Sequence, residues 1–190
     1  MTRWLAGLLL PLALGGCTTD QLAQAAIGTL TQAFLGGPGS PIVIGGAPGG
    51  GLATADQAPT GPYAALIQQA HARVNEARLA AGVKPLVLDA TISQVAALSA
   101  EARGNHTPVT YAGSPVDQEG KLLAQVGVDA STLANLQTQV LDASGASAVD
   151  NLLAEPGHRE GIVNAAFGHV GYGVYRDAGG HYWWVMDEVR

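Results

Sequence analysis

The sequence predicts an α+β fold, with the helices first along the chain and an antiparallel sheet last. Apolar residues recur at helical spacing from Leu66 to Ala77, in a stretch that ends at Gly82. Near the C-terminus the apolar spacing falls from about 3.6 to about 2 residues, which predicts strands over 169–175 and 181–186. The intervening Asp-Ala-Gly-Gly sequence predicts a hairpin turn between these strands.

The chain opens with a predicted export signal. Arg3 supplies a positive charge, and residues 4–14 form an apolar stretch that is too short to span a bilayer. The stretch ends in Leu14-Gly15-Gly16-Cys17, which resembles the bacterial lipobox, a cleavage site before a cysteine that receives lipid. We therefore expect lipidation at Cys17, and Thr18 favours sorting to the outer membrane, facing the periplasm. A short membrane anchor with an incidental cysteine is the alternative.

A linker is expected between the signal and the folded domain. Residues 36–61 are rich in Gly, Pro and Ala, a composition that buries too little surface to offset chain entropy. A short helix over about 20–34 and a short strand at 42–44 are the only elements expected there. The predicted divisions are a signal at 1–17, a flexible linker at 18–60 and a folded domain at 61–190.

The first half of the domain is expected to be helical. One helix covers about 62–82, and a second begins at Asp89, whose side chain can cap it. Ser114-Pro115 is expected to open a third helix. Residues 130–153 are predicted to form one or two more helices. In the last strand Trp183 and Trp184 are expected on opposite faces of the sheet, one in the core and the other either lining a surface groove or simply packed.

Composition excludes several classes of function. The 190 residues carry a formal net charge of −6 and no Lys/Arg cluster, so a nucleic-acid partner is not expected. Cys17 is the only cysteine, which excludes an intramolecular disulfide and a cysteine-based zinc site. The chain also lacks a Gly-x-Ser-x-Gly nucleophile motif and a His-Glu-x-x-His helix.

Three motifs in order resemble the bacterial branch of the CAP superfamily, also called SCP-like domains. The first is VNEAR at 74–78, followed by Gly82 and by PLVLD at 85–89. The second is EPGHR at 155–159, and the third is VGYGV at 170–174 with YWW at 182–184. The resemblance implies a three-layer α/β/α sandwich with a small antiparallel sheet over about 61–190.

Some motif residues are expected to be structural. Asn75 and Arg78 lie within one turn of the first helix, where the five-donor fork of Arg78 can bind the carbonyls of a neighbouring loop. Pro156 and Gly157 build a tight helix entry that places His158 on the first turn, with Arg159 beside it. A neutral His158 imidazole could accept a proton or a metal ion.

The resemblance also implies a cavity with two histidines and two acidic residues. His158 matches one histidine and His106 is the candidate for the other, whereas Ser99 stands where bacterial members often have a helix histidine. The glutamate of the family's GENI motif has no counterpart here, since the region holds Gln137 and Gln139. Glu155 or Asp150 could supply an acid. These donors would bind a divalent metal only weakly, so no cofactor is expected. The remaining candidates, His71, His169 and His181, are expected in solvent.

Three functions remain open. The first is a non-enzymatic binding or interaction domain anchored to the envelope through lipid, with a protein or envelope component as its partner. The second is a hydrolase or metal-dependent enzyme that uses His106 and His158. The third is a carrier of a small apolar ligand such as a lipid. The missing GENI glutamate favours the first.

Overall fold

The computed structural model describes residues 51–111, 114–115 and 119–190. The signal, Cys17 and the elements expected at 20–34 and 42–44 lie outside these residues. The first half of the described chain contains α2 (Ala64–Ala80), β1 (Val87–Leu88), α3 (Ala90–Gly104), β2 (Thr110–Tyr111), β3 (Ser114–Pro115) and α4 (Glu119–Gln125). The second half contains β4 (Leu133–Val140), α5 (Gly145–Ala154), α6 (Pro156–Ile162), β5 (His169–Arg176) and β6 (Tyr182–Val189).

The main sheet has four strands in the order β1-β5-β6-β4. Strands β5 and β6 form the predicted hairpin, and β4 pairs with β6 in the antiparallel sense. The short β1 adds to β5 in parallel. A separate two-stranded ribbon joins β2 and β3.

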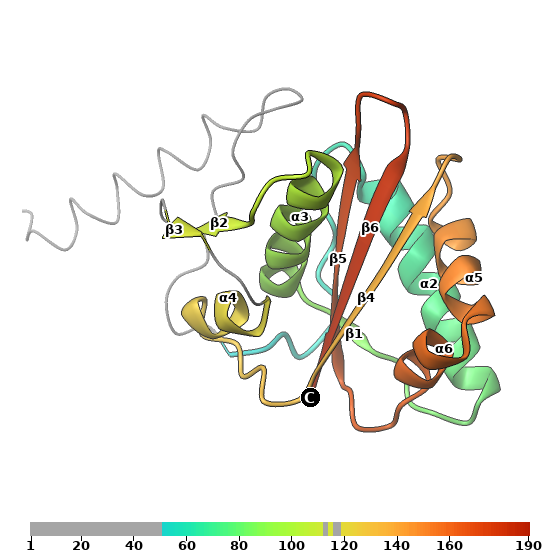
Figure 1. The fold of residues 1–190 in the computed structure, drawn as a ribbon. Coiled ribbons are helices and arrows are strands. Elements are labelled where there is room, and N and C mark those ends of the chain that lie inside the picture. Colours follow the sequence, from blue (N-terminus) through green and yellow to red (C-terminus); the bar gives the residue numbers. More distant parts are fainter. Residues whose placement is uncertain (1–50, 112–113, 116–118) are drawn as a thin grey trace, which may run out of the picture.

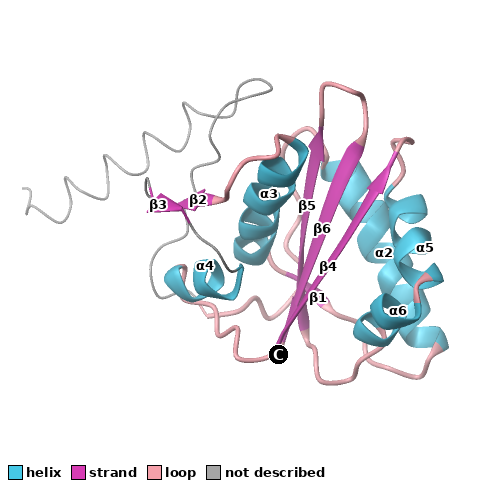
Figure 2. Ribbon diagram, viewed as in Figure 1, coloured by secondary structure: helices cyan, strands magenta, loops and turns pink. Residues whose placement is uncertain are grey.

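Helices cover both faces of this sheet, so the three-layer α/β/α architecture is confirmed (Figure 1). One face carries α3, which packs on β5 and β6, with α4 beside it. The other face carries α2, α5 and α6, as the colouring by secondary structure makes clear (Figure 2). Trp184 and Met186 of β6 point into the core beneath α2 and α5, whereas Val185 and Val189 face α3 and α4.

Helix α3 approaches β5 closely because two glycines remove the side chains between them. A Cβ atom added to Gly173 would lie 2.0 Å from the carbonyl oxygen of Ala96, and one added to Gly171 would lie 2.2 Å from the backbone nitrogen of Ser93. At the start of α3, the Asp89 side chain accepts hydrogen bonds from the backbone nitrogens of Thr91 and Ile92, as its predicted capping role requires.

Two expectations for the middle of the chain are wrong. Residues 133–140 form strand β4 rather than a helix, although Leu133, Leu136 and Val140 have helical spacing. Pairing along the whole of β6 overrides that weak local signal. The third helix begins at Glu119, while Ser114–Pro115 forms β3.

A segment before α2 lies along the edge of the sheet. The backbone nitrogen of Gln57 donates to the Leu88 carbonyl at 3.0 Å, and the Asp56 carboxylate accepts from the Leu88 nitrogen at 2.8 Å. Ala53 donates to Asp89 at 2.9 Å, and its carbonyl lies 3.0 Å from Nε2 of His169. We call residues 53–57 the edge strap. It extends the ordered contacts into the range that the sequence assigned to the linker.

Candidate functional site

His158 lies in α6, directly after the Pro156-Gly157 entry of the helix. Its Nδ1 atom is 3.0 Å from Oε2 of Glu155, the residue before the helix. The two atoms are in close polar contact but lack the alignment of a hydrogen bond. The Glu155 side chain is 70% exposed and that of His158 is 27% exposed. This pair therefore lies at the surface of the layer formed by α2, α5 and α6.

His106 lies on the other side of the sheet. It follows α3, with a left-handed backbone (φ of 54°), and its ring meets the Trp183 ring edge to face with centroids 5.9 Å apart. Trp183 faces the α3 side because it alternates with Trp184, which is buried on the opposite side. The sheet thus separates His106 from His158.

The candidate metal donors are spread over the described residues. Within 51–111, 114–115 and 119–190, no three His, Cys, Asp or Glu side chains gather closely enough to hold an ion. Asp150 of α5 pairs instead with Arg73 of α2 at 2.8 Å, and Ser99 is buried inside α3. The structure therefore does not bring the candidate donors into one site.

Arg78 ties the first helix to the loop around α6. It is fully buried, and its guanidinium donates to the carbonyls of Lys84, Ile162, Asn164 and Phe167 at 2.6 to 3.1 Å. Asn75 forms a two-way clamp on the backbone of Leu86, donating at 3.1 Å and accepting at 2.8 Å. Because each of these buried polar groups has a hydrogen-bond partner, together they hold the loops in a single arrangement.

The other motif residues lie around the entry to α6. Arg159 donates through Nε to the Leu153 carbonyl at 2.9 Å. Gly157 has open space where a Cβ would be, so no close approach requires a glycine at this position.

His71 was expected in solvent, and that expectation is wrong. It is only 9% exposed and lies between Tyr172, whose hydroxyl is 3.4 Å from Nδ1, and Asp56, whose carboxylate is 3.2 Å from Nε2. The edge strap and the buried Tyr172 cover it. His169 and His181 are partly buried. His169 contacts Ala53, and His181 contacts Asp177 at 3.2 Å.

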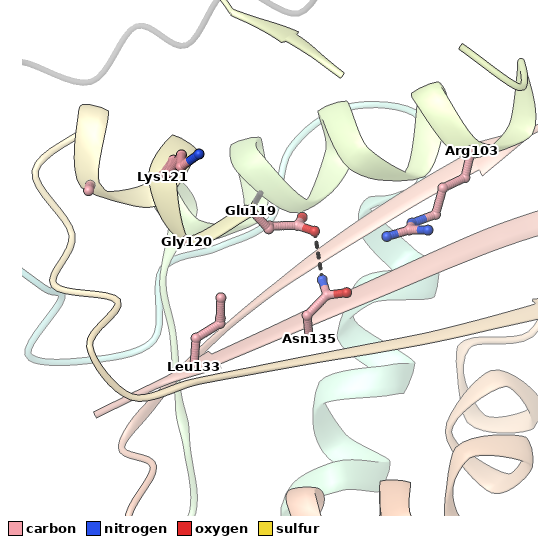
Figure 3. Close-up of a pocket in the computed structure, with 7 residues that line it drawn as sticks. Arg103, Glu119, Gly120, Lys121, Leu133 and Asn135 are labelled. Carbon is pink, nitrogen blue, oxygen red and sulfur yellow. Dashed lines mark hydrogen bonds between the residues drawn. The ribbon is translucent and has the colours of Figure 1, made fainter. Parts of the chain in front are cut away.

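A hollow of about 600 Å³ opens on the α3 face between the end of α3, the start of α4 and the edge strand β4. Figure 3 shows Arg103 of α3 on one side of the hollow and Glu119 of α4 on the other, with Asn135 of β4 hydrogen-bonded to Glu119. Leu133, Ala124, Gly120 and Lys121 complete the lining. Four of the seven lining residues are polar, but apolar atoms make up the larger part of the exposed lining surface.

Two acids share one amide at the base of the hollow. Nδ2 of Asn135 donates to Oε2 of Glu119 and to Oδ1 of Asp187, both at 2.7 Å. Gln137 in turn donates to Oδ1 of Asn135. Burial, and then the negative charge of Glu119, raise the pKa of Asp187 well above its usual range, while Arg103 opposes this shift.

Several buried polar atoms around this hollow have no hydrogen-bond partner among the described residues. They are Nε of Arg103, Oε1 of Glu119 and Oδ2 of Asp187, which come from α3, α4 and β6. No motif in the sequence points to these three residues. Arg103, Glu119 and Asp187 come from three elements that are distant in the sequence and meet only in the fold. No local sequence pattern therefore connects them.

The chain belongs to the cysteine-rich secretory protein family, known as CAP, whose model matches residues 71–187. The fold and the order of its motifs thus agree with the resemblance seen in the sequence. No curated protein sequence matches the chain.

Solved structures share the fold at low identity. An extracellular SCP-domain protein of Bacillus anthracis has 18% identity and a TM-score of 0.57, over 70% of this chain and 45% of that one. An outer surface protein of Borrelia burgdorferi has 17% identity and a TM-score of 0.50, over 64% of this chain and 90% of that one. A cysteine-rich secretory protein of Staphylococcus aureus has 17% identity and a TM-score of 0.50, over 66% and 38%. The chain spans less than half the length of the Bacillus protein.

Proposed function

We propose that this CAP domain is a non-enzymatic binding module tethered to the cell envelope. The observation that carries the proposal is the separation of His106 and His158 by the sheet, which leaves neither imidazole a second histidine with which to share a metal or a substrate. A hydrolase built on these two residues would need both at one reacting centre.

Zinc titration tests the absence of a histidine-based metal site. A ligand present at about 100 times its dissociation constant stabilises a native protein by roughly 2.7 kcal/mol, which raises the melting temperature by several degrees. We expect micromolar zinc to leave the melting temperature of the wild type, His106→Ala and His158→Ala unchanged. A shift in the wild type that disappears in both variants would overturn the proposal and favour a metal-dependent enzyme.

The tether is proposed to begin at Cys17, where the lipobox-like sequence predicts lipidation. Two or three acyl chains hold a protein on a membrane firmly, whereas one does so marginally. The extracellular and outer-surface proteins with this fold support an exported location, and no helix in the described residues of the chain is both long and apolar enough to cross a membrane.

Metabolic labelling with a fatty acid tests the tether. Cys17→Ser is expected to abolish labelling and to leave an uncleaved precursor in the cell. Labelling and processing that survive in this variant would exclude a lipoprotein.

A further inference from the structure

Strand β4 is the free edge of the four-stranded sheet (Figure 1). The opposite edge, β1, is covered by the edge strap, since Gln57 donates to the Leu88 carbonyl. Among the described residues, no backbone group outside the sheet bonds to β4. Its sequence, Leu-Ala-Asn-Leu-Gln-Thr-Gln-Val, has no charged residue, proline or glycine, and it pairs with β6 without a bulge. Edge strands usually carry such features, because they prevent pairing with another chain.

The backbone groups at this free edge belong to the odd-numbered residues of β4. At the hairpin the Asp177 nitrogen donates to the His181 carbonyl at 2.9 Å, so the odd residues of β6 face β5. The even residues of β6 therefore face β4, and the register pairs them with even residues of β4. This leaves the N–H and C=O groups of residues 133, 135, 137 and 139 pointing away from the sheet. An antiparallel partner strand can bond to each of these residues.

A second copy of β4 fits this edge when Gln137 lies opposite its own counterpart. In that register every outward residue meets another outward residue, and Gln139 lies opposite Asn135 of the second copy, with both side chains on one face. Amides that lie opposite each other can both donate and accept. Because the strand carries no charge, two copies of a chain with a net charge of −6 meet here without direct repulsion.

Leu141 supports the same register. It directly follows β4, and its side chain is 74% exposed. When the register is continued along the chain, Leu141 lies opposite Leu133 of the second copy. Leu133 lines the hollow, whose exposed surface is mostly apolar. The two-fold axis repeats this contact, so pairing would remove both exposed leucines from water.

We propose that β4 pairs in the antiparallel sense with β4 of a second copy of this chain, with Gln137 at the two-fold axis. The two four-stranded sheets then form one sheet of eight strands. Backbone hydrogen bonds between the two strands supply the affinity, and the opposed amides and leucines select the register. This self-association uses neither His106 nor His158 and does not rest on the proposed binding function.

Disulfide trapping of the full chain tests the proposal. All proteins carry Cys17→Ser, so that an engineered cysteine is the only thiol. Opposed residues of a hydrogen-bonded pair have Cα atoms about 5.5 Å apart, which a disulfide can bridge. Because paired strands hold their thiols at an effective concentration of about 1 mM, Gln137→Cys at micromolar concentration should form covalent dimers about tenfold faster than unpaired thiols do.

Two other glutamines provide the matched controls. Gln68→Cys, exposed on α2, reports the rate of chance collision. Gln139→Cys should also react slowly, because Gln139 lies opposite Asn135 rather than opposite itself.

A charge at the leucine contact supplies a second test. Leu141→Asp, added to Gln137→Cys, should slow dimer formation by about tenfold, because a carboxylate would then meet the apolar surface around Leu133. Leu79→Asp makes the same change at an exposed leucine of α2 and should leave the rate unchanged. Both leucines are exposed, so neither change should disturb folding.

Three outcomes would overturn the proposal. The first is equal cross-linking of Gln137→Cys and Gln68→Cys, and the second is equal slowing by Leu141→Asp and Leu79→Asp. The third is faster cross-linking in a mixture of Asn135→Cys and Gln137→Cys than in Gln137→Cys alone, which would indicate a different register. None of them involves zinc or a histidine, so failure here is distinguishable from failure of the proposed function, which the zinc titration detects.

Discussion

Asp187 and Glu188 are consecutive residues of β6 whose side chains lie on opposite faces of the sheet, each fully buried. Asp187 joins the acid pair of the hollow, whereas Glu188 lies near Arg78 in the other layer. Burial raises the pKa of Glu188 to about 8, and the Arg78 charge opposes the rise. Two acids near a chain end would ordinarily be expected in solvent. Their burial follows from the sheet, so sequence patterns alone could not predict it.

Glu188 should make the protein less stable as the pH rises. The unfolded chain releases this proton near pH 4.5, while the folded chain keeps it until about pH 8. The contribution to stability is therefore fully present below pH 4.5 and is lost as the pH rises through about 8. Between these values the free energy of unfolding should fall by up to about 1.4 kcal/mol per pH unit on account of this one group.

Urea unfolding of the wild type and Glu188→Gln at several pH values between 5 and 8 measures this effect. The variant cannot titrate at this position, so its stability should depend less on pH. Asp187 titrates in the same direction but is present in both proteins, and it cancels in the comparison. Identical pH slopes would contradict the assignment.

At the scale of elements, the contact between α3 and β5 depends on glycines. The added Cβ of an alanine at 173 would meet the backbone of Ala96, which cannot rotate away as a side chain could. The helix would have to move off the sheet, and it carries Arg103 with it.

Gly173→Ala is therefore expected to cost about 1–3 kcal/mol or more in the free energy of unfolding. Gly157→Ala is the matched control: it has open space around the new methyl group and lies within α6, so its stability should change by less than about 1 kcal/mol. Urea unfolding measures both. A Gly173→Ala protein as stable as Gly157→Ala would show that α3 can shift freely.

Elements with a strong local pattern were predictable, and those decided by pairing were not. Strands β5 and β6 alternate clearly around an Asp-Ala-Gly-Gly turn, and α3 begins at its capping Asp89. Strand β4 has Leu133, Leu136 and Val140 at helical spacing, and only its partner β6 makes it a strand. The hollow was unpredictable for a similar reason. Its residues come from α3, α4, β4 and β6, so no spacing in the sequence connects them.

For the molecule as a whole, the edge strap determines where the folded unit begins. Asp56 connects the strap to Leu88 and to His71, and Gln57 adds a backbone hydrogen bond to Leu88. The family match starts only at His71, so these contacts precede the segment of the chain that the family pattern covers.

Limited proteolysis with a non-specific protease should leave a fragment that begins before Ala53. Asp56→Ala removes two of the strap's contacts and should move the start of the resistant fragment toward Pro62. Asp150→Ala, which removes an exposed pair with Arg73, should behave as the wild type. Mass spectrometry identifies the fragments, and a wild-type fragment that begins after Gly61 would contradict the role of the strap.

The strap also decides how the domain would respond to mechanical load. It lies against β1 at one edge of the sheet, and β4 forms the opposite edge. Tension applied to the chain before residue 53 would act first on the few hydrogen bonds of the strap, which would break in succession. Their release would lengthen the chain while β4, β5 and β6 kept their register. A pulled domain would thus yield at one edge and keep the shape of the opposite edge.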